Sequence, residues 1–372
     1  MPNATGLAIP VEQDKHQKAS ITTDTMSELY KLLAVSTEKQ VNIGDYIQAL
    51  AAAQFLPKTD GFIQREKLKD YDGERCKVFM NGWYMHHTEQ WPPSEKITPL
   101  FVAFHINASA KEGLVSKGSI DYLKRFQPVG CRDYHTRDLL LSKGVDAYFS
   151  ACLTLTLGMR YKSDEKKDKC YFVDPFIPKK RKVIDEIYNT FWLLTHYKKW
   201  NAIEKITDKL PYKKNFKRRI RACRLYRTYI KIFTEETLTE AEYISQRNKN
   251  YLTRYNTDME RLDEAKRLVN KYAKARMVVT SRIHCALPCL GLETPVIFTE
   301  NTAQTEKKVC RMGGISDLFN TISFNGNRFE TNFKFCRSTR ISKKNVPTNK
   351  NLWRQYATKL IETCKDFINK NN

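Results

Sequence analysis

Short apolar runs alternate with helix-like segments over the first 160 residues of this 372-residue chain. YKLLAVST (30–37) has the character of a buried strand, and the segment after it (40–57) predicts a helix that Asn42 or Asp45 can cap and that runs to Pro57. Three later runs repeat this order, namely CKVFMNGW at 76–83, PLFVAFHIN at 99–107 and PVGCRDYHTRDLLLSKGV at 128–145, in which Asp133 can cap the helix. Because strands that alternate with helices form a parallel sheet covered on both faces, we expect a doubly wound α/β domain over residues 26–160.

The second half of the chain shows the same alternation. A charged stretch, RYKSDEKKDK (160–169), is a plausible linker, and the chain is longer than a single core usually extends. We therefore expect a second α/β domain over residues 170–345, with a basic helical insert. The remaining parts are a polar leader at 1–25, expected to be disordered, and a C-terminal helix within 346–372.

Several classes of protein do not fit this composition. No run of 18 or more apolar residues exists, and the first 25 residues lack the apolar stretch of a signal peptide, so we expect a cytoplasmic protein. None of the ten cysteines forms a CxxC pair, which argues against a zinc module or a disulfide framework and favours reduced, mostly buried thiols. We expect no metal.

The formal charge of +23 is unevenly distributed. Residues 179–231 contain 17 Lys and Arg against 4 Asp and Glu. In the amphipathic helix predicted within this segment, Lys214, Lys217, Arg218, Arg221 and Arg224 share one face, and Phe216, Ile220, Cys223 and Tyr226 share the other. Such a field attracts nucleic acid, an anionic membrane surface such as the inner face of the cell membrane, or a phosphate-bearing substrate, but it also fits a merely solvated surface.

Polar side chains gather where the strands of the first domain are expected to end. Ligands of doubly wound sheets bind beyond the carboxyl ends of the strands, so these residues should line one edge of the sheet. They are Asn42, Gly44, Asp45, Asn81, Trp83, His86, His87, His105 and Arg132.

The stretch VVTSRIHCALPCLGL (278–292) passes from a buried strand to an apolar helix through three polar residues. Ser281 and Arg282 should follow the strand, and His284 should lie in the first helical turn, where free N–H groups favour an anion. The arginine fork matches a carboxylate or phosphate, and a neutral histidine beside it could transfer a proton. Alternatively, Arg282 pairs with a carboxylate of the protein and His284 bonds to a backbone carbonyl.

The loop NGWYMHHTEQWPP (81–93) combines two tryptophans with polar side chains. Trp83 and Trp91 could stack on a sugar ring whose hydroxyls bond to neighbouring donors, or they could simply pack within the loop. The HHTE string lacks the helical spacing of a zinc site.

Three motifs in this order resemble the polysaccharide pyruvyl transferase family. They are NIGD (42–45), the CRD of residues 131–133, and SRIHCALPCLGLETPVIF (281–298), so the resemblance runs from about Val41 to Phe298. It implies two Rossmann-like halves that face a cleft, as in GT-B glycosyltransferases. It also implies transfer of a pyruvyl group from phosphoenolpyruvate to sugar hydroxyls, with formation of a cyclic ketal and release of phosphate.

The same resemblance implies roles for particular residues. Arg132 and Arg282 fall where the family binds the pyruvyl donor, together with Ser281, and His284 falls on the motif histidine. We expect His284 to act as the general acid and Asp45 as the base, with no cofactor besides the substrate phosphoenolpyruvate. Residues expected to bind the acceptor sugar, which could be lipid-linked, are Asn42, Gly44, Asn81, Trp83, His86, His87 and His105.

Two other readings remain open. A glycosyltransferase with the same fold would use a nucleotide sugar and could bind its ribose through Glu293 or Glu300. A basic nucleic-acid-binding protein is the third reading, but we expect no nucleic acid partner because the basic segment lacks interleaved stacking aromatics and any recognised binding module.

Overall fold

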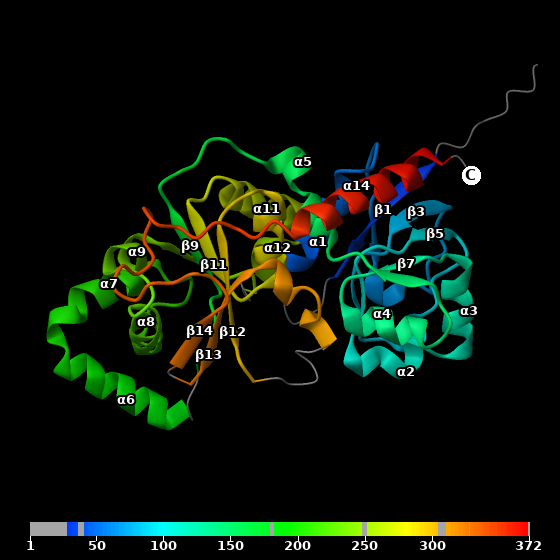
Figure 1. Ribbon diagram of the computed structural model, residues 1–372. Coiled ribbons are helices and arrows are strands. Elements are labelled where there is room, and N and C mark those ends of the chain that lie inside the picture. The colour runs from blue at the N-terminus through cyan, green and yellow to red at the C-terminus, as the bar shows by residue number, and fades with distance from the viewer. Residues whose placement is uncertain are drawn as a thin grey trace, which may run out of the picture.

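The computed structural model describes residues 28–35, 41–178, 182–247, 251–303, 310–326 and 328–370. The chain forms a mixed α/β fold with parallel sheets in both halves and helices packed around and between them (Figure 1). The expected leader, residues 1–25, lies outside the described residues.

The described residues of the first half form eight short parallel strands. Their bounds are β1 Leu29–Ala34, β2 Phe62–Gln64, β3 Cys76–Phe79, β4 Gly82–Tyr84, β5 Ile97–Leu100, β6 Phe104–Ile106, β7 Val129–Cys131 and β8 Ala147–Phe149. They pair in the orders β2-β1-β3-β5 and β4-β6-β7-β8. Backbone hydrogen bonds from Met80 to Leu100 and from Gly82 to Ala103 bridge the interruptions, so the two groups continue one twisted surface.

The second half contains a six-stranded sheet in the order β10-β9-β11-β12-β13-β14. Its strands are β9 Cys170–Val173, β10 Glu242–Ile244, β11 Met277–Thr280, β12 Val296–Asn301, β13 Asn320–Asn325 and β14 Arg328–Thr331. Only β14 runs antiparallel to its neighbour in this sheet. The alternation read from the sequence is therefore confirmed as parallel α/β structure in both halves.

Helices occupy the connections between the strands. In the first half they are α1 Ile43–Ala53, α2 Lys111–Leu114, α3 Lys117–Arg125, α4 Tyr134–Leu141 and α5 Gly158–Tyr161. In the second half they are α6 Lys182–Thr195, α7 Trp200–Lys209, α8 Phe216–Tyr229, α9 Glu235–Glu240, α10 Tyr251–Arg254, α11 Asp258–Ala273, α12 Ile283–Gly291 and α14 Trp353–Asn369. Single 3-10 turns span Arg65–Lys67, Thr88–Gln90, Ala108–Ala110, Leu153–Thr156, Tyr197–Lys199 and Ser316–Leu318.

Side-chain caps fix where the helices near the sheet edges begin. The Asn42 side chain accepts a hydrogen bond from the Gly44 N–H, and Asp133 accepts one from Thr136, which confirms both predicted caps. Thr257 and Glu260 form a reciprocal capping box at the start of α11. Helix α1 ends at Ala53, earlier than the expected Pro57, because the chain turns at Phe55 and Leu56.

One apolar core joins the two halves of the molecule. It contains residues of α1, α11, α12 and α14, and α1 packs along α11 and α12 in the middle of the molecule (Figure 1). Helix α14 returns to the first half, where the ring of Phe367 lies 5.6 Å from that of Phe79. The C-terminal helix therefore ties the end of the chain to the sheet with which it begins.

Helix α12 lies close to the segment that follows β8, and at two glycines the backbones of these segments are in direct contact. A Cβ atom on Gly158 would lie 2.1 Å from the Gly291 carbonyl oxygen, and one on Gly291 would lie 2.3 Å from the Leu155 oxygen. Real side chains never approach so closely, so both positions require glycine.

One detail of the sequence reading needs correction. On α8, Arg218 is buried and donates a hydrogen bond to the Asp208 carbonyl, whereas Phe216 is exposed, so the predicted basic and apolar faces are partly wrong. The thiols are mostly buried as expected, with Cys336 the exposed one. No helix in the described part of the chain is long and apolar enough to span a bilayer.

We predict that Gly291→Ala lowers the stability of the protein by about 2–3 kcal/mol, since the new methyl group must displace backbone rather than a side chain. Thermal unfolding of the purified variant would measure this. Gly118→Ala is the matched control: nothing lies within 4 Å of its added Cβ, and alanine favours the helix by up to about 1 kcal/mol. Equal melting temperatures for the two variants would contradict the close backbone contact.

Candidate active site

A proline shapes the first turn of α12. Pro288 has no N–H to donate to the carbonyl of His284 four residues earlier, and its ring crowds that carbonyl. His284 accordingly leaves helical geometry, with φ −82° and ψ 25°. The kink separates the Arg282–Ile283 entry from the rest of the helix and leaves the His284 carbonyl without a helical partner.

Gln246, just past the end of β10, supplies that partner. Its side-chain Nε2 donates to the His284 carbonyl (3.2 Å), and its backbone N–H donates to the Asp174 carboxylate (3.0 Å). The Gln246 carbonyl accepts from the N–H of Ile43 at the start of α1 (3.1 Å). One residue thus connects β9, α1 and α12.

Asp174 holds the SRIH turn from the other side. Its carboxylate accepts a hydrogen bond from Arg282 Nε (3.0 Å), and its backbone carbonyl accepts one from the Ser281 hydroxyl (2.6 Å). Asp174 adopts a left-handed conformation with φ 41°, a strained geometry that aims both groups at the turn. Of the two alternatives for Arg282, the carboxylate pair is present, yet the arginine uses only Nε in this contact.

His105 and Asp133 form a buried pair at the ends of β6 and β7. His105 Nδ1 lies 2.5 Å from the Asp133 carboxylate, which also accepts bonds from the N–H and hydroxyl of Thr136. Burial and the positive charge of Arg132 lower the pKa of His105 to about 4, although Asp133 acts in the opposite direction. The imidazole is therefore neutral at pH 7 and donates through Nδ1, leaving Nε2 as an acceptor.

Four polar side chains near this region have buried atoms with no hydrogen-bond partner among the described residues. They are His105 Nε2, Arg132 Nε and Nη2, His284 Nε2 and Arg311 Nε. The Arg132 side chain is only 1% exposed, and the Asp133 carboxylate lies 3.8 Å from its Nε, too far for a hydrogen bond. Buried guanidinium N–H groups without hydrogen-bond partners are costly, and an anion placed among them would satisfy them.

The charges of this cluster act on one another. Burial, followed by the charges of Arg132 and Arg311, lowers the pKa of His284 well below its usual value. Burial and the neighbouring Arg132 also lower the pKa of Arg311, to about 10. The four groups therefore share one positively charged, poorly solvated space in which His284 is neutral.

Asp45 is the acidic member of the site. Its two oxygens accept hydrogen bonds from the side chains of Asn42 (3.0 Å) and Gln48 (3.2 Å). Burial raises the pKa of Asp45, while the charges of Arg65, Arg311 and Arg132 oppose this shift. Asp45 is thereby placed in electrostatic contact with the arginines of both halves of the chain.

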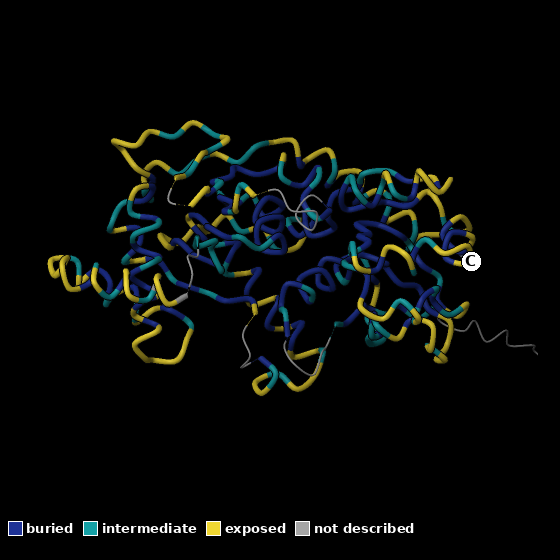
Figure 2. The backbone as a smooth tube through the Cα atoms, turned by 90° about the horizontal axis from the view of Figure 1, so that it is seen from below, coloured by how far each residue is buried: buried dark blue, intermediate teal, exposed yellow. Residues whose placement is uncertain are grey.

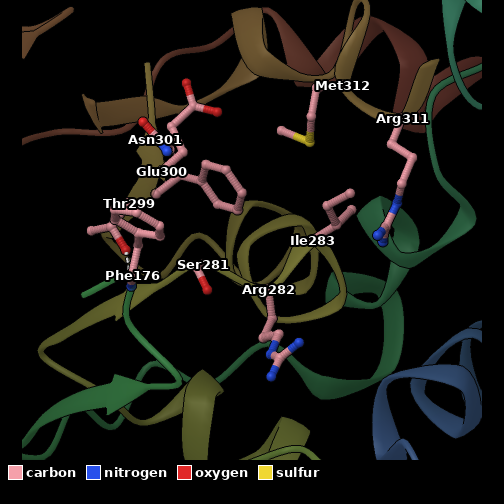
Figure 3. Close-up of a pocket in the computed structure, with 10 residues that line it drawn as sticks. Phe176, Ser281, Arg282, Ile283, Thr299, Glu300, Asn301, Arg311 and Met312 are labelled. Atoms are coloured by element: carbon pink, nitrogen blue, oxygen red, sulfur yellow. Dashed lines mark hydrogen bonds between the residues drawn. The ribbon is translucent and has the colours of Figure 1, made fainter. Parts of the chain in front are cut away.

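Two cavities open on the Ser281–Arg282 turn. One cavity, of about 330 Å³, extends from this turn to Glu300 and Asn301 at the end of β12 and to Arg311. Figure 3 shows Glu300 and Asn301 on one side of this cavity and Arg311 on the other. The other, of about 530 Å³, reaches Asp174 and the α7–α8 region, including Tyr212 and Arg221. Both volumes suit small-molecule sites.

The structure brings together some, though not all, of the residues singled out from the sequence. The residues that lie where the two halves of the chain meet, a region that we call the seam, are Asn42, Gly44, Asp45, His105, Arg132, Ser281, Arg282 and His284. Trp83 is connected to these residues through Arg65, whose guanidinium lies 5.0 Å from the centre of the Trp83 ring. Asn81 is buried and donates to the Gln48 carbonyl, while His86 and His87 are exposed and anchored through their backbone N–H groups on Glu66.

Two sequence-based suggestions change. Trp91 is buried against Tyr84, Phe101, Phe104 and Tyr122, so it packs in the core and is unavailable to a sugar. Of the two glutamates considered for a nucleotide ribose, Glu300 lines the smaller cavity. Glu293 lies beyond the opposite end of α12 and pairs with Lys162 and Arg354.

Sequence reasoning did not find Arg65, Asp174, Gln246 and Arg311. Asp174 follows directly after the buried strand β9, and Gln246 lies two residues past β10, so a position beyond a strand end is a signal that could have found both. Arg65 likewise follows directly after the short strand β2, whereas Arg311 had no comparable signal in the sequence. Within the described ranges, no group of three or more His, Cys, Asp or Glu is arranged to hold a metal ion.

The chain matches a known protein family. The family model described as polysaccharide pyruvyl transferase matches residues 42–302, which include α1, the CRD segment and the SRIH turn. No curated protein matches the chain.

We predict that the neutral His105 makes the free protein less stable in acid. Its pKa is lower folded (about 4) than unfolded (about 6.5), so only the unfolded chain gains a proton at pH 5, and stability falls as the pH falls through this window. The stability advantage of wild type over His105→Asn should shrink by about 2 kcal/mol between pH 7 and pH 5. Denaturant unfolding at both pH values measures it, with the exposed His86→Asn as control. A constant advantage would contradict the buried neutral imidazole.

Proposed function

Since this chain belongs to the polysaccharide pyruvyl transferase family, we propose that it transfers a pyruvyl group from phosphoenolpyruvate to hydroxyls of a polysaccharide or lipid-linked sugar. The product is a cyclic ketal, and phosphate is released. No cofactor takes part in this scheme, and phosphoenolpyruvate is the pyruvyl donor.

The buried Arg132 guanidinium is the observation that carries this proposal. Its Nε and Nη2 lack partners, Arg311 Nε beside it also lacks one, and Arg282 keeps nitrogens free of its Asp174 contact. Phosphoenolpyruvate has a carboxylate and a phosphate close together, which two or three arginines can bind with planar, bidentate hydrogen bonds. The N-terminus of α12 adds a further partial positive charge.

The proposed reaction moves two protons. One sugar hydroxyl attacks the substituted carbon of phosphoenolpyruvate while the methylene carbon is protonated to a methyl group. The second hydroxyl then displaces phosphate from the same carbon and closes the ketal ring. The two hydroxyl protons end on the methyl group and on the released phosphate.

His284 suits the first proton transfer once the donor is bound. In the free protein, burial and the charges of Arg132 and Arg311 hold the pKa of His284 low. A bound trianion would offset those charges, raise that pKa and let the imidazole take up a proton that it can then deliver. Asp45, whose pKa burial raises, is our candidate for the base that accepts a hydroxyl proton.

We further propose that the two halves act as facing Rossmann-like units, in the manner of GT-B enzymes. The related strand orders support this, because in both sheets the first strand lies between the second and the third. The acceptor would approach past Asn42 and Gly44, with Trp83 at the rim, or through the cavity lined by Tyr212 and Arg221. Arg221, stacked 4.0 Å from the Tyr212 ring, suits a phosphate-bearing acceptor.

We predict that phosphoenolpyruvate raises the melting temperature and that Arg132→Lys and Arg282→Lys each weaken its affinity about tenfold or more. Lysine keeps the charge but loses the planar fork. A thermal-shift titration measures this. Arg137→Lys is the matched control, since Arg137 lies five residues from Arg132 but is paired with Asp138 at the surface. Nucleotide sugars belong in the same screen, because Glu300 in the cavity keeps that alternative testable. Stabilisation by a nucleotide sugar and none by phosphoenolpyruvate would refute the proposed donor.

We predict that His284→Gln retains phosphoenolpyruvate binding but lowers turnover roughly 10²- to 10⁴-fold, since glutamine cannot transfer a proton. Phosphate release and donor affinity should be measured on the same preparation. Calorimetry in buffers of different ionisation enthalpy should also detect proton uptake when donor binds wild type, and less uptake for the variant. A stable variant with near-normal turnover would end the catalytic assignment of His284.

A further inference from the structure

Helix α6 turns an apolar face toward solvent. Val183, Ile187, Phe191 and Leu194 fall on one side of the helix, and each is 64–67% exposed. Figure 1 shows α6 at the outer edge of the molecule, away from the seam between the halves. In Figure 2 much of this end of the tube is coloured as exposed. A contiguous row of four large apolar side chains is unusual on a free surface and marks an interaction site.

The orientation of α6 is fixed by its opposite face. Leu193 is buried, Asn189 accepts a hydrogen bond from Arg227 of α8 (2.8 Å), and that guanidinium lies 5.5 Å from the Trp192 ring. At the end of the helix, the Trp200 indole donates to the Leu193 carbonyl (2.7 Å). Because these contacts hold the polar and aromatic side against α8, the helix cannot roll its aliphatic face inward without breaking them.

Aromatic and cationic side chains are exposed on the elements that α6 leads into or contacts. The exposed aromatic residues are Tyr197, Trp200, Tyr212 and Phe216. From the exposed lysines of these elements we define the basic rim as Lys198, Lys205, Lys209, Lys213, Lys214 and Lys217. Residues 198–221 carry ten Lys and Arg against two Asp and Glu. The aromatics between these lysines were not anticipated from the sequence.

We propose that the apolar face of α6 and the basic rim form a docking surface for an anionic lipid bilayer. Aliphatic side chains enter the acyl boundary, tyrosine and tryptophan favour the headgroup level, and lysines are attracted to anionic headgroups. This combination distinguishes a helix that lies in the membrane surface from one that crosses it.

The other possible occupants fit less well. A second copy of the chain would bring two basic rims against each other in a symmetric interface, and like charges oppose that contact. Single-stranded nucleic acid could stack on the aromatics, but it has no use for Val183, Ile187 and Leu194. Only a surface that is both anionic and apolar complements both the apolar face of α6 and the basic rim.

The inference concerns a surface on the outer side of α8 and goes beyond the proposed reaction. It requires neither phosphoenolpyruvate nor the sugar acceptor to be correctly identified. If the acceptor is lipid-linked, the same surface would hold the enzyme where that acceptor is found.

Vesicle co-sedimentation of the full chain tests the docking surface. We expect binding to vesicles containing phosphatidylglycerol, little binding to pure phosphatidylcholine, and weaker binding as salt is raised. Ile187→Gln with Phe191→Gln should reduce binding at least tenfold, because glutamine keeps the helix but not the apolar face. Leu141→Gln with Met259→Gln, two exposed apolar residues outside the surface, is the matched control and should bind as wild type. Lys213→Gln with Lys214→Gln and Lys217→Gln should weaken binding and flatten its salt dependence.

Three results would overturn the proposal. They are absence of binding to anionic vesicles, equal binding by the α6 variant and wild type, and a wild-type dimer in sedimentation that the α6 substitutions dissolve. The chain could also bind a single-stranded oligonucleotide more tightly than anionic vesicles, with the α6 variant binding it as well as wild type does. That result would assign the basic rim to nucleic acid and not to a bilayer. The thermal shift with phosphoenolpyruvate should be the same in the α6 variant and wild type, so failure of docking and failure of the proposed reaction are separately visible.

Discussion

The packing of the first turn of α1 against the first turn of α12 is the contact on which the site depends. A Cβ on Gly44 would lie 3.2 Å from the Cβ of His284, so a side chain at residue 44 would push the two turns apart by a few tenths of an ångström. The bond from the Ile43 N–H to the Gln246 carbonyl fixes the same approach. Through this contact Asp45 of one half comes under the influence of arginines from both, and two positive helix ends point into one space.

That arrangement of charges costs folding free energy when no anion is bound. Arg132 and Arg311 lose water without gaining a carboxylate partner at hydrogen-bond distance, and two imidazoles are held neutral by burial and the nearby cations. Folding elsewhere must offset this, and the shared core of α1, α11, α12 and α14 is the obvious source. We expect a bound anion to reverse the sign of the main electrostatic interactions, so that the preorganised charge that weakens the free protein would strengthen the complex.

Much of the fold was readable from the sequence because strands and helices differ in apolar period and begin with recognisable caps. Asn42 and Asp133 cap helices as predicted, and the SRIH turn follows its strand. Arg311 could not be found, because its relevance comes from a chain segment that only the tertiary fold brings to the seam. The outward face of α6 was missed for a different reason: its apolar spacing is the same whether the face meets a core or solvent. Trp91 shows the converse ambiguity, since its sequence allowed either sugar stacking or packing, and the fold places it in the core.

A proline inside a helix is usually counted as a defect, because it removes one hydrogen bond and bends the axis. In α12 the missing bond leaves the His284 carbonyl available, and a side chain from another strand end takes its place. The side chain of Gln246 therefore replaces a hydrogen bond within the helix, while the backbone of Gln246 bonds to Ile43 of α1 and to Asp174. The alignment of the two halves is thus encoded partly by an interaction that the local sequence of α12 is unable to make for itself.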